Sequence, residues 1–91
     1  MSKPVAKTLV PQHVLARQVG DETVMLDLDN GTYYGLDQVG TRIWQLLAEG
    51  KTLAQVCDTM IEEYEVSREE IERDVTRLVA DLSDKGLLKP A

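Results

Sequence analysis

The sequence predicts an α+β fold of the winged helix-turn-helix-like kind, with a three-stranded antiparallel sheet followed by three helices. Three observations predict it. Residues 14–36 contain three short runs with strand character, separated by turns that contain glycine. Residues 39–85 contain three apolar stripes at helical spacing, with capping residues at their ends. A short connection, residues 65–67, joins the last two helices, which is typical of a helix-turn-helix pair.

The composition is that of one small folded domain. The 91 residues are 43% hydrophobic and 29% charged, which is enough for one modest core. Residues 1–12 show no periodicity and predict a flexible N-terminal arm, with the folded domain over residues 13–91. No apolar run approaches the roughly 20 residues that a membrane span needs, and no secretory signal is evident. A single cysteine leads us to expect a cytoplasmic protein without a disulfide.

The predicted strands cover Val14–Val19, Thr23–Leu28 and Thr32–Leu36. The middle strand alternates most clearly, because its side chains fall into two sets on opposite faces. The apolar set is Val24, Leu26 and Leu28. The other set, Met25 and Asp27, is mixed.

The dipeptide Asn30-Gly31 predicts a tight two-residue hairpin turn before the third strand, because both residues tolerate a positive φ. Tyr33 and Tyr34 then point to opposite faces of that strand. A bulge beside the glycine would exchange these faces, so the pattern leaves open which tyrosine faces inward.

The predicted helices begin at recognisable caps. Asp37 caps the first helix, Val39–Ala48. Thr52 with Gln55, and Ser67 with Glu70, form capping boxes for the second and third helices. The stripes of the three helices are, in order, Val39, Ile43, Leu46 and Leu47; Leu53, Val56, Cys57, Met60, Ile61 and Tyr64; Ile71, Val75, Leu78, Val79 and Leu82.

Glycines mark the helix ends and one close contact. Gly50 ends the first helix, and Gly86 ends the third, Arg68–Lys85. Gly40 lies inside the first helix, where it costs about 1 kcal/mol relative to alanine, so we expect close packing there. Ile43 and Trp44 are predicted to stabilise the fold rather than contact a ligand.

No catalytic constellation is evident, so the sequence does not predict an enzyme. Cys57 lies inside an apolar helical stripe, which favours a buried structural thiol over a nucleophile. His13, the sole histidine, has no carboxylate or cysteine partner near it in the sequence. The chain contains no phosphate-binding glycine loop and no metal-ligand spacing, so we expect no cofactor and no metal.

Charge disfavours a nucleic-acid partner, although winged helix-turn-helix domains often bind DNA. The net charge is −6, which also disfavours an anionic membrane surface. The third helix has more acidic than basic side chains, and phosphate neutralisation supplies most non-specific affinity. Its basic residues are Arg68, Arg73, Arg77 and Lys85; its acidic residues include Glu69, Glu70, Glu72, Asp74, Asp81 and Asp84.

Peptide recognition is the function class that remains. An unpaired strand edge offers main-chain donors and acceptors to an extended peptide. We expect the peptide-binding residues to be those of the third strand and of one face of the third helix: Thr32, Tyr33, Tyr34, Gly35, Leu36, Asp74, Arg77, Leu78 and Asp81. From pattern alone, a purely structural role for these residues is equally compatible with the sequence.

Four segments together resemble the PqqD-like family, whose members recognise leader segments of ribosomally made, modified peptides. The resemblance spans about residues 15–88. It is carried by the runs Leu26-Asp27-Leu28-Asp29-Asn30-Gly31-Thr32-Tyr33-Tyr34-Gly35-Leu36, Val39-Gly40-Thr41-Arg42-Ile43-Trp44-Gln45-Leu46-Leu47 and Glu63-Tyr64-Glu65-Val66, and by a last segment from Arg73-Asp74-Val75 through Leu82 to Lys85-Gly86-Leu87-Leu88. The strand and the first helix are most similar to free-standing members from lasso-peptide gene clusters, with PqqD of pyrroloquinoline quinone synthesis as the near alternative.

The resemblance implies a non-catalytic domain that binds a leader antiparallel to strand Thr32–Leu36. In lasso systems such a protein delivers the precursor peptide to a cysteine protease and then a cyclase; in the alternative pathway the partner is a radical SAM enzyme. A winged-helix transcription regulator and a small structural subunit are the competing interpretations. The N-terminal arm and the exposed edge both permit a homodimer.

Overall fold

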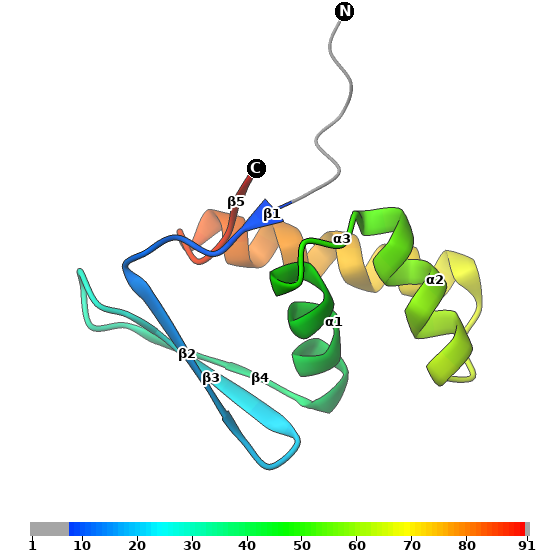
Figure 1. The fold of residues 1–91 in the computed structure, drawn as a ribbon, viewed down its shortest axis with the longest axis horizontal. Coiled ribbons are helices and arrows are strands. Elements are labelled where there is room, and N and C mark those ends of the chain that lie inside the picture. Colours follow the sequence, from blue (N-terminus) through cyan, green and yellow to red (C-terminus); the bar gives the residue numbers. More distant parts are fainter. Residues whose placement is uncertain (1–7, 91) are drawn as a thin grey trace, which may run out of the picture.

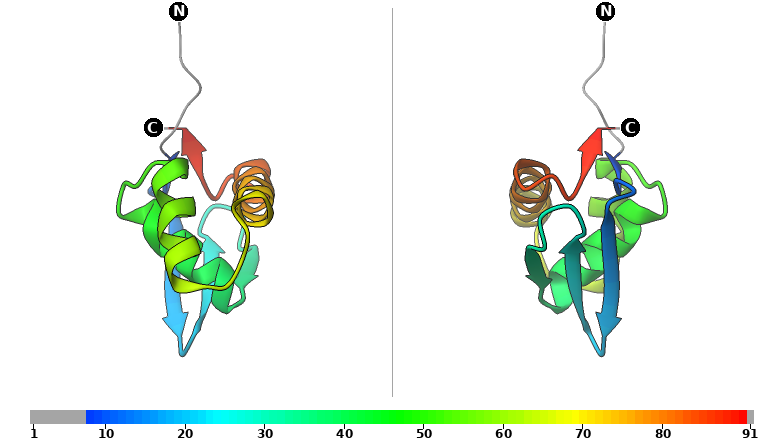
Figure 2. Two further views of the ribbon diagram at one scale, coloured as in Figure 1. Left: turned by 90° about the vertical axis from the view of Figure 1, so that its right-hand side faces the viewer. Right: turned by 90° about the vertical axis from the view of Figure 1, so that its left-hand side faces the viewer.

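The computed structural model describes residues 8–90 and confirms the three-stranded antiparallel sheet followed by three helices (Figure 1). The sheet is formed by β2 (Val14–Val19), β3 (Glu22–Asp27) and β4 (Tyr33–Leu36), in the order β2-β3-β4. These bounds differ from the predicted ones by one residue at most. In both views of Figure 2, β4 is the strand of this sheet nearest to α3 (Arg68–Asp84).

The predicted two-residue turn at Asn30-Gly31 is wrong. The N–H of Asp27 donates to the carbonyl of Thr32 at 2.9 Å, so residues 28–31 form the loop between β3 and β4. Only Gly31 has a positive φ, 75°. The loop is built on Asp27, whose Oδ1 accepts from the backbone N–H of Asp29 at 2.9 Å. A buried aspartate therefore holds the loop together with Asn30, whose Oδ1 accepts from the N–H of Thr32 at 2.9 Å.

The longer loop settles which tyrosine faces inward. Tyr34 pairs with Met25, which is fully buried, so Tyr34 faces the helices. Tyr33 pairs with Leu26 on the other face and is 69% exposed.

The alternation predicted in β3 is present, but its apolar side faces away from the core. Thr23, Met25 and Asp27 are buried. Val24 is 38% exposed and Leu28, just beyond the strand, is 57% exposed. The sequence period alone identifies two faces and does not decide which one the helices cover.

The helices begin at the predicted caps. In α1 (Gln38–Ala48), the Asp37 side chain accepts from the N–H of Gly40, and in α2 (Leu53–Glu63) both bonds of the Thr52–Gln55 capping box are present. In α3, Ser67 accepts from the N–H of Glu70; the return bond of a full box is not among the described hydrogen bonds. Helix α3 ends one residue before the predicted end.

Both glycine-terminated helices close with the same two backbone bonds. After α3, the N–H of Gly86 donates to Ser83 at 3.1 Å and that of Leu87 to Leu82 at 2.8 Å. This is a Schellman motif, with Gly86 at a φ of 75°. Gly50 occupies the matching place after α1, at a φ of 90°. Leu87 is buried, as its position after the glycine predicts.

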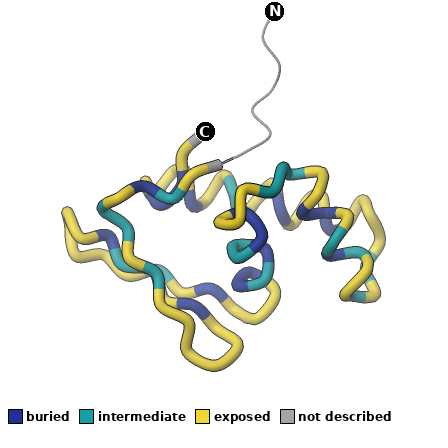
Figure 3. The backbone as a smooth tube through the Cα atoms, viewed as in Figure 1, coloured by how far each residue is buried: buried dark blue, intermediate teal, exposed yellow. Residues whose placement is uncertain are grey.

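The core lies between the inner face of the sheet and the three helices (Figure 3). The second and third helices contribute the stripes that the sequence predicts, and β3 and β4 contribute Met25 and Leu36. The predicted stripe of α1 is wrong at Val39, which is exposed, while Ile43, Leu46 and Leu47 are buried. The buried hydrophobic residues are Met25, Leu36, Ile43, Leu46, Leu47, Val56, Cys57, Met60, Ile71, Val75, Leu82, Leu87 and Leu88.

Part of the predicted N-terminal arm belongs to the fold. β1 (Thr8–Leu9) pairs antiparallel with β5 (Lys89–Pro90) and forms a second, two-stranded sheet. Pro11 is buried. Residues 1–7 of the arm lie outside the described residues, so the division of the chain at residues 12 and 13 stays a prediction.

We expect Trp44→Ala to lower the unfolding midpoint clearly, because Trp44 is half-buried against the core. The loss should be roughly 2–3 kcal/mol, below the about 3–5 kcal/mol of a fully buried tryptophan. Its indole Nε1 is buried without a partner among the described residues, so Trp44→Phe removes no hydrogen bond and should cost less. Thermal unfolding of both variants checks this. If Trp44→Phe lost as much unfolding free energy as Trp44→Ala, the indole N–H would have to be hydrogen-bonded in solution.

Candidate peptide-binding edge and groove

The outer edge of β4 is open in the described part of the chain, because β4 pairs there with β3 alone. Hydrogen-bonded and non-bonded pairs alternate along an antiparallel ladder, and Asp27 donates to Thr32. The backbone groups of Tyr34 therefore point toward β3, and those of Tyr33 and Gly35 point toward the open edge. Two residues of β4 thus offer N–H and carbonyl groups to an incoming strand.

A hollow of about 340 Å³ lies between α3 and the start of α1, just beyond the end of β4. All four helix residues predicted to bind peptide line it: Asp74, Arg77, Leu78 and Asp81. The first helix contributes the rest of the lining: Asp37, Val39, Gly40 and Ile43.

The strand residues predicted for the same site, residues 32–36, do not line this hollow. The predicted site therefore divides into a backbone edge along β4 and a side-chain hollow at its end. Peptide contact by these residues stays a prediction. Sequence reasoning did not place Asp37, the cap of α1, or Val39 in the lining, although the short connection between strand and helix was a signal for both. Ile43, predicted to have a structural role only, is buried in the core and also lines the hollow.

The junction between β4 and α1 places the hollow. The N–H of Gly40 donates to Asp37 Oδ1 at 2.8 Å, and the Thr41 hydroxyl donates to the Leu36 carbonyl at 3.4 Å. A Cβ atom on Gly40 would lie 3.2 Å from Asp37 Oδ1 and 3.5 Å from the Leu36 Cβ. The close packing expected of Gly40 is therefore confirmed, and it lets α1 begin directly after the strand.

Charge is distributed unevenly along this surface. The hollow carries the carboxylates of Asp37, Asp74 and Asp81 against the single guanidinium of Arg77. At the other end of β4, the Lys85 Nζ lies 5.2 Å from the centroid of the Tyr34 ring, within the range of a cation–π contact. None of the ion pairs between described residues involves Asp74, Arg77, Asp81 or Lys85.

One basic residue of α3, Arg68, is less available to nucleic acid than the sequence suggests. Arg68 forms ion pairs with Asp58 and, at 3.1 Å, with Glu72. Its bond to Asp58 raises the pKa of Arg68 most, followed by its bond to Glu72. The cation at the start of α3 is therefore already neutralised by carboxylates, which disfavours DNA binding further.

A second ion pair joins α1 to the end of α2. The Glu63 carboxylate accepts from Arg42 Nε at 2.8 Å and from Nη2 at 2.7 Å. This fork raises the pKa of Arg42 and lowers the pKa of Glu63, mainly through the shared hydrogen bonds. Both side chains are about a third exposed, so the pair orients the helices more than it stabilises them.

His13 has a carboxylate partner that its sequence neighbours do not provide. Pairing of β2 with β3 places Val14 opposite Asp27, and His13 Nε2 lies 3.9 Å from Asp27 Oδ2. With Asp29 these residues could supply three metal ligands within 4.8 Å of one another. Asp27 Oδ1 already accepts backbone bonds of the loop, so the geometry is explained by the turn.

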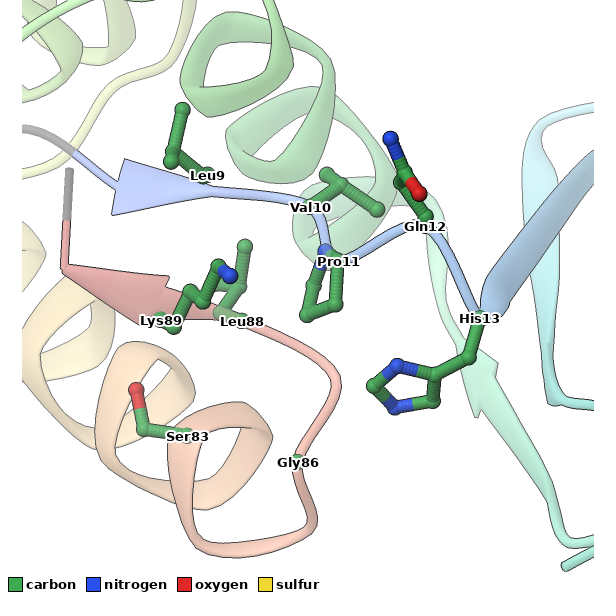
Figure 4. Close-up of a pocket in the computed structure, with 9 residues that line it drawn as sticks. All are labelled: Leu9, Val10, Pro11, Gln12, His13, Ser83, Gly86, Leu88 and Lys89. Atoms are coloured by element: carbon green, nitrogen blue, oxygen red, sulfur yellow. The ribbon is translucent and has the colours of Figure 1, made fainter. Parts of the chain in front are cut away.

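The largest hollow, about 750 Å³, lies between the segment leading into β2 and the end of α3 (Figure 4). His13 and Ser83 both line it, on separate walls with Gly86 between them in the view. No hydrogen bond between described residues joins this serine to the histidine.

The match to a known family follows the same elements. The family model described as "Coenzyme PQQ synthesis protein D (PqqD)" matches residues 22–88, from β3 to the residue before β5. The chain belongs to the PqqD family. This confirms the resemblance seen in the sequence, and the matched span contains both the open edge and the hollow.

Two solved structures of PqqD-like proteins share the fold over nearly the whole chain. One, "TbiB1 in Complex with the TbiA(beta) Leader Peptide", is 43% identical with a TM-score of 0.83, covering 87% of this chain and 92% of that one. The other, "Lasso peptide synthetase B1 complexed with the leader peptide", is 32% identical with a TM-score of 0.87, covering 93% and 100%. Both relatives were solved with a leader peptide bound.

Curated relatives match a shorter region. Two proteins named "PqqA binding protein", from Rhodopseudomonas palustris strains TIE-1 and HaA2, are each 36% identical over 55 residues, or 60% of this chain. The chain spans about half the length of these curated relatives, 54%. No helix between residues 8 and 90 is both long and apolar enough to cross a membrane.

We expect Cys57 to be an unreactive thiol in the folded protein. It is 4% exposed, and burial raises its pKa, which keeps the thiol protonated and hidden. Alkylation by iodoacetamide at pH 8 should be more than about tenfold slower in buffer than in concentrated urea. Mass spectrometry over time measures both rates. Equal rates would show that α2 opens readily and that Cys57 is accessible.

Proposed function

We propose that this PqqD-family protein binds the leader segment of a ribosomally made precursor peptide as an added strand on β4. The leader runs antiparallel to β4 and pairs with the outward backbone groups of Tyr33 and Gly35. Side chains of the leader enter the hollow lined by Asp74, Arg77, Leu78 and Asp81. The protein has no catalytic role of its own and presents the bound precursor to a modifying enzyme in the cytoplasm.

The observation that carries this proposal is an unpaired edge strand that ends at a lined hollow. β4 is paired on one side only among the described residues, and α1 begins at once beyond it. An edge of this kind gives affinity through the backbone, while the hollow gives selectivity through side chains. Two relatives with TM-scores above 0.8 were solved with a leader peptide bound, which supports leader binding by this fold.

The pathway is proposed to be that of a lasso peptide, with a cysteine protease and then a cyclase as the partner enzymes. The relatives covered over most of their length are a lasso peptide synthetase B1 and TbiB1, each with a leader. A role in pyrroloquinoline quinone synthesis, with a radical SAM enzyme, is the second candidate, because the curated relatives are PqqA binding proteins. The match that supports this second candidate covers 60% of the chain, less than the matches to the two solved structures. Binding of each class of precursor leader would separate the two.

We expect Gly35→Pro to weaken leader binding about tenfold or more, because it removes an N–H of the open edge without removing a ladder bond. Gly35→Ala is the matched control, since an added Cβ meets nothing within 4 Å. Calorimetric titration with a leader peptide measures the affinity, and thermal unfolding measures the fold. Unchanged affinity in a folded Gly35→Pro variant would exclude strand addition on β4.

We expect Asp74→Ala and Leu78→Ala to weaken leader binding, by roughly 1–2 kcal/mol for a side chain that is a hot spot. Thr76→Ala and Arg73→Ala are controls on other faces of α3 and should cost little. Leu78 is half-buried, so the unfolding midpoint of Leu78→Ala is measured in parallel to separate lost binding from lost stability. Amide shift mapping locates the peptide directly. Shifts confined to β2, with Asp74 and β4 silent, would contradict the proposed groove.

A further inference from the structure

We propose that this groove selects leader segments in a fixed charge order, with a basic side chain first, an apolar one next and an acidic one last. The proposal rests on the proposed function and names the class of peptide that the same site takes. It is carried by where charges lie along β4 and α3, and by the direction of an antiparallel strand.

The two ends of the groove are identified by contacts on the same strand. Tyr34, near the start of β4, lies under the Lys85 ammonium at 5.2 Å. The end of β4 leads through Asp37 into the hollow on α1 and α3. Between Lys85 and Asp74, α3 runs for about 16 Å at 1.5 Å per residue. Asp74 and Lys85 therefore lie toward opposite ends of this surface, while Asp81 lies one helical turn before Lys85.

The two ends differ in charge. The hollow carries three carboxylates, Asp37, Asp74 and Asp81, and one guanidinium, so its net charge is negative. Asp37 also accepts the helix-capping bond from the N–H of Gly40 through Oδ1. Lys85 is exposed and has no carboxylate partner within ion-pair distance among the described residues. An acidic peptide side chain would meet a single positive charge at Lys85, whereas the hollow has Arg77 but a net negative charge.

An apolar residue lies between the charged residues of α3. Leu78 stands between Asp74 and Lys85 along the helix, and it lines the hollow together with Val39 and Ile43. Ile43 is buried and Leu78 is half-buried. An incoming apolar side chain would therefore bury the remaining exposed apolar surface of the hollow. The middle position of the peptide is therefore the one that contributes most affinity, and the flanking charges contribute selectivity.

Strand direction converts this arrangement into a sequence order. A peptide antiparallel to β4 has its N-terminal part at the Leu36 end and its C-terminal part at the Tyr34 end. Its side chains alternate, so every second residue faces the helices. The N-terminal inward residue meets the acidic hollow, and the C-terminal inward residue meets Lys85. The matching segment is basic-x-apolar-x-acidic.

Three synthetic peptides of nine residues test the order. The forward peptide is Ac-Thr-Ser-Lys-Thr-Leu-Ser-Glu-Thr-Ser-amide. The reversed peptide exchanges its lysine and glutamate, so composition and net charge are identical. The neutral peptide has glutamine at both places. At low ionic strength the forward peptide should bind the full chain about tenfold tighter than the reversed one, and the difference should shrink with salt.

Charge reversals in the protein assign each end. Lys85→Glu should bring the affinities of the forward and reversed peptides to within about twofold of each other, because the acidic residue of the peptide loses its partner. Asp74→Lys should have the same effect, because the basic residue of the peptide loses its partner. Arg73→Glu, which makes a similar change elsewhere on α3, should leave the ratio of the two affinities unchanged. Lys85→Gln, which adds no negative charge at the helix end, is the second variant if Lys85→Glu is poorly folded.

The outcomes separate this inference from the proposed function. Equal affinity of forward and reversed peptides, with shifts on β4, would overturn the charge order and leave strand addition intact. Tighter binding of the reversed peptide would also overturn it and would indicate a parallel strand. Failure of all three peptides, the neutral one included, to shift β4 amides at millimolar concentration would overturn both.

Discussion

The turn from β4 into α1 is the constraint on which the rest of the structure depends. Asp37 caps the helix by accepting from the N–H of Gly40, and a Cβ at residue 40 would lie only 3.2 Å from Asp37 Oδ1. A single residue, Asp37, separates the end of β4 from the start of α1. That geometry places Ile43 and Leu47 over the inner face of the sheet. It also leaves the outer edge of β4 uncovered and builds the hollow at its end.

Local signals in the sequence predicted the helices well. The caps at Asp37, Thr52 and Ser67 and the stop at Gly86 depend on residues within a few positions of one another. The helical period alone places Asp74, Leu78 and Asp81 along one side of α3, so their appearance on one hollow needed no tertiary information. The fold class followed from the same local patterns, combined with the order of strands and helices.

The errors arose where distant residues decide the outcome. The loop between β3 and β4 depends on the buried carboxylate of Asp27, and its burial depends on packing that the dipeptide Asn30-Gly31 does not report. The apolar face of β3 is exposed because the helices cover the other face of the sheet, and this choice is not visible in the strand's own sequence. The nearness of His13 to Asp27 follows from strand register. In each case the deciding contact crosses between elements, and the side-chain pattern of a single strand does not contain it.

The pairing of β1 with β5 bears on the order in which the chain folds. Thr8 lies opposite Pro90, so this pair closes a loop of almost all the described residues. The entropic cost of closure rises with loop length, and contacts between distant residues generally form after local ones. The helices and the β2-β3-β4 meander therefore have the shorter route to formation. The groove can exist before the two ends meet, and the large hollow of Figure 4 is completed last.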